Sequence, residues 1–145
     1  MSGILGGQNL WGSKSGIIGQ TELDYEEGTW TVTVSGADAS LGHTTGHYTK
    51  VGKRVWYDWY SSATTFSNAS GAAAVILPFT AIDTANLYPA FNYQHGNAVD
   101  GSSRGGYVQK GDNKLYFIDD GTYTGATYVN GSSKYIMVSG SFTIA

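Results

Sequence analysis

The sequence predicts an all-β protein, a single β-sandwich or jelly-roll-like domain that follows an extended N-terminal arm. Of the 145 residues 14% are aromatic and only 13% are charged, and aromatic and β-branched side chains favour pleated sheets. The 21 glycines suit the turns between short strands. Several segments alternate between apolar and polar residues, and none shows a convincing helical period. A chain of this length forms one hydrophobic core rather than two.

The first strand is predicted where an acidic turn gives way to strict alternation, in the segment DYEEGTWTVTV at residues 24–34. One face of a strand here carries Trp30, Val32 and Val34, and the other carries Thr29, Thr31 and Thr33. This is typical of a strand with one buried and one solvated face. We therefore assign residues 25–145 to the β-sandwich domain and residues 1–24 to the arm.

The arm is rich in glycine and contains a short echo, SGILG at residues 2–6 and SGIIG at residues 15–19. It has two interpretations, a disordered leader or a segment that docks on another protein. Disordered segments are normally poor in large apolar side chains, which favours docking. The candidate docking residues are Ile4, Leu5, Leu10, Trp11, Ile17 and Ile18.

The longest strand-like region covers residues 48–66, with a hairpin turn at Gly52 and Lys53. Its second half places large rings on both faces, so we expect one face to be covered by a neighbouring subunit or to bind a glycan. The candidates for this oligomer interface or glycan site are Trp56, Tyr57, Trp59 and Tyr60. In strand alternation Tyr57 and Trp59 share a face with Val55, and Trp56 and Tyr60 share the opposite face with Asp58.

The second half of the chain predicts further strands. Residues 72–79 form an apolar run suited to a buried strand. Residues 107–110 and 114–118 flank a compact hairpin signal at residues 111–113. In the last strand, at residues 135–144, one face carries Ile136, Val138, Phe142 and Ile144. Eight or nine strands are expected in all.

The residue types that carry catalysis do not form a usable pattern. His43 and His47 would share a metal on a helix, but the neighbouring glycines and threonines disfavour helix, so we expect two exposed loop histidines. The acidic residues at positions 24–27 and 119–120 invite comparison with a glycosidase pair, but they lie beside glycines in expected turns. No phosphate loop, dinucleotide fingerprint or nucleophile elbow is present. We predict that the protein is not an enzyme and has no catalytic residue, cofactor or metal.

Charge and hydropathy exclude two further classes. The net charge of −3 gives no basic field for a phosphate backbone, so we expect no nucleic-acid partner. No run of about 18 apolar residues and no signal-peptide pattern occurs, so we expect neither membrane insertion nor export by that route. The absence of cysteine fits assembly in a reducing cytoplasm, with stability from packing and oligomerisation.

Three segments carry a resemblance to a known family, namely DYEEGTWT at residues 24–31, GHYTKVGKRV at 46–55 and LPFT at 77–80. They resemble a β-rich domain of tailed-bacteriophage structural proteins, found in fibre, tail and head-decoration proteins. The family pattern reads YEEGTWTP and G-x-Y-T-K-I-G-N-x-V, so Val32 replaces the proline and Lys53 replaces the asparagine here. The glycine-rich arm also resembles the short leaders of phage virion proteins.

The resemblance implies a non-enzymatic virion structural protein, assembled in the cytoplasm of the bacterial host. A short chain with an anchoring arm suits a capsid decoration or cement protein, or a short head fibre. The expected partners are two further copies in a homotrimer and the major capsid protein or another virion protein. The alternative is a tail-fibre or tail-tip module that binds a receptor or glycan on the host surface. The family supplies no catalytic residue.

Overall fold

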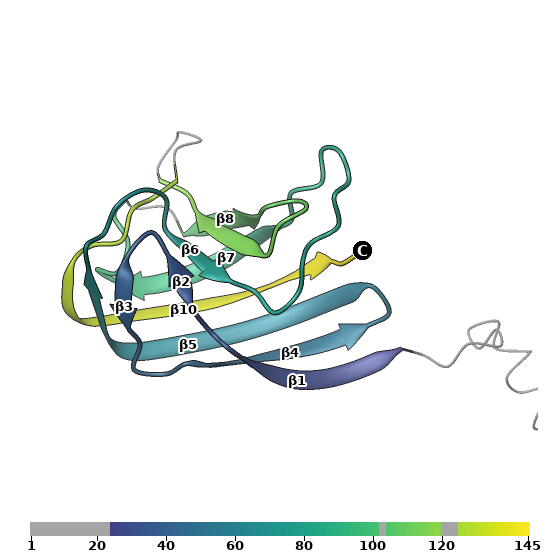
Figure 1. Ribbon diagram of the computed structural model, residues 1–145, viewed down its shortest axis with the longest axis horizontal. Helices are drawn as coiled ribbons and strands as arrows, with labels where there is room; N and C mark the ends of the chain where they lie inside the picture. The colour runs from purple at the N-terminus through teal and green to yellow at the C-terminus, as the bar shows by residue number, and fades with distance from the viewer. Residues whose placement is uncertain (1–23, 102–103, 120–124) are drawn as a thin grey trace, which may run out of the picture.

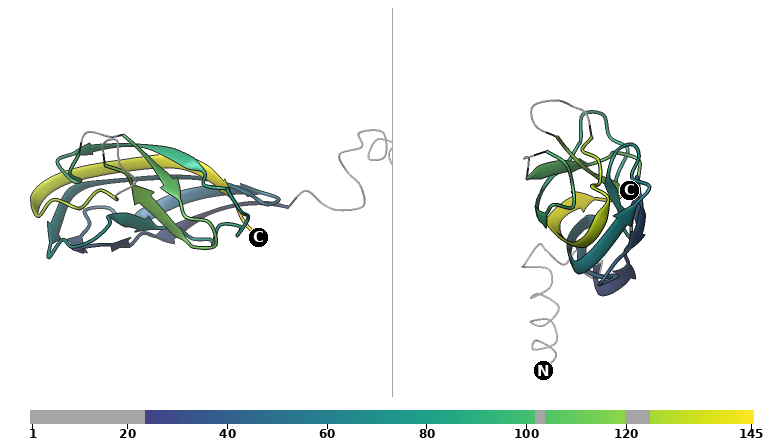
Figure 2. Two further views of the ribbon diagram at one scale, coloured as in Figure 1. Left: turned by 90° about the horizontal axis from the view of Figure 1, so that it is seen from above. Right: turned by 90° about the vertical axis from the view of Figure 1, so that its left-hand side faces the viewer.

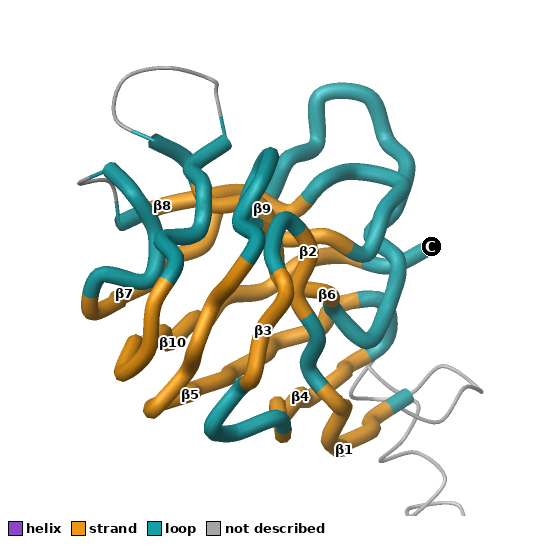
Figure 3. The backbone as a smooth tube through the Cα atoms, turned by 60° about the vertical axis from the view of Figure 1, so that its left-hand side comes forward, coloured by secondary structure: helices purple, strands orange, loops and turns teal. Residues whose placement is uncertain are grey.

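A computed structural model describes residues 24–101, 104–119 and 125–145. The prediction of an all-β protein is confirmed, since these residues form ten strands and no helix (Figures 1 and 3). The predicted docking residues of the arm, Ile4, Leu5, Leu10, Trp11, Ile17 and Ile18, lie outside the described residues. The strands are β1 (Tyr25–Thr31), β2 (Val34–Ser35), β3 (Asp38–Ser40), β4 (Thr45–Val51), β5 (Arg54–Ser67), β6 (Ala74–Ile76), β7 (Ala90–Gly96), β8 (Gly105–Val108), β9 (Lys114–Phe117) and β10 (Gly131–Thr143).

The strands belong to one antiparallel sheet in the order β1-β4-β5-β10-β7-β8-β9-β6-β2, and β3 pairs with the end of β5. The expected division into the two sheets of a sandwich or jelly roll is not confirmed. Instead the sheet curls, as the two views of Figure 2 show. Its first and last strands in this order, β1 and β2, are consecutive in the chain, so the curl brings the two edges of the sheet together.

Hydrogen bonds hold these two edges near each other. The predicted continuous strand is interrupted at Val32 and Thr33, where the backbone N–H of Ile76 donates to Thr33 O at 2.9 Å. The indole Nε1 of Trp30 donates to Ile76 O at 3.0 Å. Val32 itself is buried, with 1% of its surface exposed. The break therefore lets the chain leave β1, cross the opening of the curled sheet and pair with β6 as β2.

The predicted alternation in β5 is confirmed. Residues 54–60 alternate strictly between exposed and buried positions, because one face of the strand meets the core. The hairpin turn at Gly52 and Lys53 and the hairpin that joins β8 to β9 are also present. We call the face that carries the exposed residues of β1, β4, β5, β10 and β7 the outer face, and the face that packs on the core the inner face.

The core lies inside the curl of the sheet. It joins residues of β5 and β10 to residues of β6, β7, β8 and β9, and to two segments without strand structure at Ala98–Val99 and Ala126–Tyr128. Phe117 lies near its centre, with ring contacts to Phe91, Tyr93 and Tyr128 at centroid distances of 5.7, 4.7 and 6.1 Å. The ring of Phe66 stacks on Tyr128 at 4.3 Å.

A bulge in β5 explains two buried hydroxyl groups. Thr64 opposes Lys134 but Ser61 opposes Ile136, so β5 has one residue more than β10 between these pairs. Ala63 takes up the extra residue with a φ of 52°, a value that costs energy outside glycine. Ser61 faces inward by the alternation of β5, and the bulge brings Thr64 to the same face, where Ser61 Oγ and Thr64 Oγ1 bond each other at 2.8 Å.

Glycines opposite aromatic residues recur through the sheet. At each of these positions the ring on one strand lies over the glycine directly across from it, in the space that a Cβ atom would occupy. Four of these pairs lie on the inner face and one, Gly96 with Tyr135, lies on the outer face. Glycine leaves room for the opposing ring and so supports a strongly curled sheet. The pairs are Gly28 with Tyr48, Gly46 with Trp30, Gly96 with Tyr135, Gly106 with Phe91 and Gly140 with Tyr57.

Candidate functional site

The three segments that carry the family resemblance lie together in the structure. β1 pairs with β4 along its whole length. Across this pair Tyr48 covers Gly28 and Trp30 covers Gly46, so each strand supplies a ring for a glycine of the other. The ring of Phe79, from the third segment, meets Tyr48 edge-on at a centroid distance of 5.0 Å. The segments therefore form one packed unit, which we call the β1–β4 unit.

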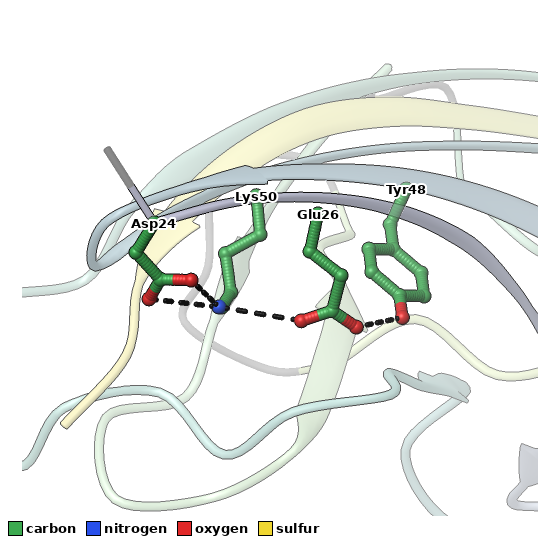
Figure 4. Close-up of polar contacts among 4 residues, drawn as sticks. All are labelled: Asp24, Glu26, Tyr48 and Lys50. Atoms are coloured by element: carbon green, nitrogen blue, oxygen red, sulfur yellow. Dashed lines mark hydrogen bonds and ion pairs between the residues drawn. The ribbon is translucent and has the colours of Figure 1, made fainter. Parts of the chain in front are cut away.

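Four polar side chains of this unit form a continuous chain of contacts (Figure 4). Lys50 Nζ donates to both carboxylate oxygens of Asp24, at 2.8 and 3.0 Å, and lies 3.3 Å from Glu26 Oε2. Tyr48 Oη donates to Glu26 Oε1 at 2.5 Å. The Lys50 side chain is only 11% exposed, whereas the carboxylates of Asp24 and Glu26 reach solvent. The contacts therefore join β1 to β4 and pair the ammonium group with both carboxylates.

The electrostatics of this chain stabilise its ordinary charge states. The hydrogen bond from Tyr48, followed by that from Lys50, lowers the pKa of Glu26. The hydrogen bond to Asp24 raises the pKa of Lys50, and the bond to Glu26 raises the pKa of Tyr48. At neutral pH Glu26 is ionised, Lys50 is charged and Tyr48 keeps its proton, so none of the three is poised for proton transfer. We assign the chain of contacts a structural role.

A groove of about 530 Å³ lies on the outer face, across the middle of four neighbouring strands. The strands β4, β5, β10 and β7 all contribute side chains to it. A second, polar hollow adjoins it at residues 42–45 and shares His47 and Tyr60 with it. The first groove is lined by His47, Asp58, Trp59, Tyr60, Asn92, Tyr93, Gln94, Met137, Val138 and Ser139.

The structure separates the four aromatic residues proposed for an oligomer interface or glycan site. Tyr57 and Trp59 point inward and are 1% and 3% exposed, so their rings belong to the core. Trp59 Nε1 donates to His43 O at 3.0 Å, whereas the buried Tyr57 hydroxyl has no hydrogen-bond partner among the described residues. Trp56 and Tyr60 lie on the outer face and are 46% and 48% exposed. Tyr60 borders the groove.

The histidines and acidic residues singled out from the sequence do not converge on one site among the described residues, and Asp120 lies outside them. His43 is in a loop, as expected, but His47 lies within β4, and both are exposed. Asp24 and Glu26 belong to the contacts with Lys50. Within residues 24–101, 104–119 and 125–145 no group of three or more histidine, aspartate or glutamate side chains is placed to hold a metal ion.

A buried histidine was not singled out from the sequence. His95 is 7% exposed, and its ring stacks on Tyr93 at 5.5 Å. Both ring nitrogens face donors, since the backbone N–H of Ala98 lies 3.2 Å from Nδ1 and Arg104 Nη1 lies 2.9 Å from Nε2. Burial, followed by the charge of Arg104, lowers the pKa of His95. A second proton on this ring would face a donor and a positive charge, so the neutral ring is favoured.

The groove residues on β7 and β10 were also not predicted from the sequence. Asn92, Gln94, Met137 and Ser139 occupy alternate, exposed positions of these strands. The alternation itself was a usable signal that they share one face. Their placement beside Asp58 and Tyr60 depends on the pairing of strands that are far apart in the chain.

Within the described ranges there is no helical segment with the length and hydropathy required to span a membrane. Comparison with protein-family models, curated proteins and solved structures found no match.

Proposed function

We propose that this chain is a non-enzymatic structural protein of a bacteriophage virion, either a capsid decoration or cement protein or a short head fibre. The observation that carries the proposal is the β1–β4 unit. The three segments that resemble phage structural proteins are separated in sequence, yet they pack on one another through the pairs Gly28–Tyr48 and Gly46–Trp30 and through Phe79. The resemblance therefore concerns residues that need each other structurally, which supports a shared domain rather than a chance match of short strings.

Assembly into a homotrimer is part of the proposal. Tyr25 and Trp56 are 55% and 46% exposed on the outer face, and large exposed apolar groups favour contact with another protein surface. β1 also forms a ladder with β4 alone among the described strands, which leaves its other edge open to a neighbouring subunit. Tyr25 is the first residue of β1, and Trp56 opposes Ser141 near the C-terminal end of β10. Figure 1 shows that these two strand ends are at the same end of the molecule.

In this proposal the arm attaches the protein to the particle by binding the major capsid protein or another virion protein. Full burial of one aliphatic side chain stabilises a contact by roughly 1.5–3 kcal/mol. Burial of four such side chains offsets much of the entropy cost of ordering a glycine-rich segment. The four are Ile4, Leu5, Ile17 and Ile18.

The test uses particles of the phage that encodes the protein. We expect purified virions to contain the chain in a fixed ratio to the major capsid protein, measured by gel densitometry. The double substitution Ile17→Ser and Ile18→Ser should abolish incorporation while leaving the domain folded and its oligomer intact in sedimentation equilibrium. A matched control, Gln8→Ser with Asn9→Ser, changes the same arm without removing an aliphatic group and should be incorporated normally.

Two results would contradict the proposal at different points. Absence of the wild-type chain from purified virions refutes the structural role itself. Normal occupancy by the Ile17→Ser, Ile18→Ser variant refutes docking through the arm, and attachment would then have to involve the β domain.

A further inference from the structure

The outer-face groove has a regular internal arrangement. His47 opposes Asp58, Asp58 opposes Ser139 and Ser139 opposes Asn92, so four polar side chains form a straight row across β4, β5, β10 and β7. Neighbouring strands are about 4.8 Å apart, so such a row extends over about 14 Å. In the adjacent row Tyr60 opposes Met137, which in turn opposes Gln94.

The polar groups of the groove are available to a ligand. None of the side chains of Asp58, Asn92, Gln94 and Ser139 has a hydrogen bond or ion pair with another described residue. Together they offer a carboxylate acceptor, two amides that both donate and accept, and a hydroxyl that does both. This combination suits a ligand whose own groups both donate and accept hydrogen bonds at short intervals.

The apolar part of the groove is equally exposed. Tyr60 and Met137, which oppose each other in the second row, are 48% and 41% exposed. Trp56 lies on the same face two residues before Asp58 and is 46% exposed. Along β5, Asp58 therefore lies between Trp56 and Tyr60 on the same face, and of these two rings Tyr60 borders the groove. An aromatic face packs well on a ligand surface made of C–H groups.

We propose that this groove binds a glycan, with a pyranose ring packed on Tyr60 and its hydroxyls bonded by Asp58, Asn92, Gln94 and Ser139. A sugar ring presents both an apolar C–H face and a rim of closely spaced hydroxyls, which matches the two adjacent rows of the groove. The inference goes beyond the structural role, because it assigns the folded domain a ligand site that does not depend on the arm.

Other occupants match the groove less well. A nucleic acid is disfavoured by the Asp58 carboxylate and by the net charge of −3. Peptide binding by strand addition needs a free sheet edge, whereas the strands that form the groove are paired with neighbours on both sides. A second copy of the chain would bury four unpartnered polar side chains in a dry interface, at a cost for each one that finds no partner.

The experiment is a titration of the full chain with defined probes, a panel of soluble neutral oligosaccharides built from hexoses and N-acetylhexosamines, followed by tryptophan fluorescence and calorimetry. We expect saturable binding of at least one member. Asn92→Ala, Gln94→Ala and Tyr60→Ala should each raise its Kd at least tenfold. Thr29→Ala is the matched control, because Thr29 is exposed on the same face but lies outside the groove, and its Kd should not change.

Three results would overturn the proposal. The first is the absence of saturable binding to any member of the panel. The second is binding that Asn92→Ala, Gln94→Ala and Tyr60→Ala leave unchanged, because the ligand would then lie elsewhere. The third is dissociation of the oligomer by Tyr60→Ala and Gln94→Ala, which would make this face an interface between copies. Loss of virion incorporation in arm variants has no bearing on these outcomes, so the two proposals fail independently.

Discussion

The pairing of glycines with aromatic rings leads to a prediction for Gly140→Ala. Gly140 opposes Tyr57 across β5 and β10, and a Cβ atom built on it would lie 2.5 Å from Tyr57 Oη and 2.9 Å from Phe91 Cβ. Tyr57 is fully buried and Phe91 is 4% exposed, so neither ring can swing into solvent. The added methyl group must therefore be accommodated by shifts within the core.

The expected cost follows from two opposing effects. Forcing an extra methyl group into a packed core costs about 1–3 kcal/mol. Alanine recovers about 0.5–1 kcal/mol relative to glycine in a strand, because its unfolded chain has less conformational freedom to lose. We expect the free energy of unfolding to fall by up to about 2.5 kcal/mol on these magnitudes, measured by urea unfolding. Gly105→Ala is the control, since its nearest neighbour for a Cβ is Phe91 O at 3.7 Å, and it should be neutral or slightly stabilising.

A second substitution identifies the cause. Tyr57→Phe removes the hydroxyl that the new methyl group would meet, and that hydroxyl has no hydrogen-bond partner among the described residues. We therefore expect Tyr57→Phe to be nearly neutral and to reduce the loss caused by Gly140→Ala. If Gly140→Ala costs no more than Gly105→Ala, or if Gly140→Ala costs as much in the Tyr57→Phe background as in the wild type, the steric explanation is wrong.

Two further predictions concern pH. The folded-state pKa of Glu26 is lowered by Tyr48 and Lys50, so its contribution to stability is present above the unfolded pKa near 4.5 and is lost as pH falls through the folded value. Glu26→Gln should therefore flatten the loss of stability in urea unfolding below pH 4.5, and an unchanged acid profile would contradict this. The folded-state pKa of His95 is also lowered, by burial and by Arg104, so the unfolded chain takes up the proton first. The stabilising effect of the neutral ring should be complete above pH 6.5 and should decrease as the pH falls from there toward the folded pKa. His95→Gln should remove this pH dependence. A midpoint of urea unfolding that rises as the pH falls would show instead that His95 is stabilised as the cation.

Local patterns predicted much of the secondary structure. The alternation in residues 54–60 placed Tyr57 and Trp59 on one face and Trp56 and Tyr60 on the other, as observed, and the structure shows that the first of these faces is the buried one. The hairpin turns at residues 52–53 and 111–113 were also identified, because glycine at these turns leaves a local signature in the sequence. The continuous strand expected through Val32 was wrong. Its alternation persists across the break, so periodicity alone does not reveal where a ladder stops.

The sequence by itself determined that this is an all-β chain and which residues share a face of each long strand, because a strand's two faces are set by alternate residues of one segment. Only the tertiary structure decided how those strands pair, that the sheet curls as one piece, and that Asp58, Ser139 and Asn92 form a row. The physical reason is that register joins residues that are far apart in the chain, about 80 positions in the pair Asp58 and Ser139. A period of two fixes the face but carries no information on which distant residue lies opposite.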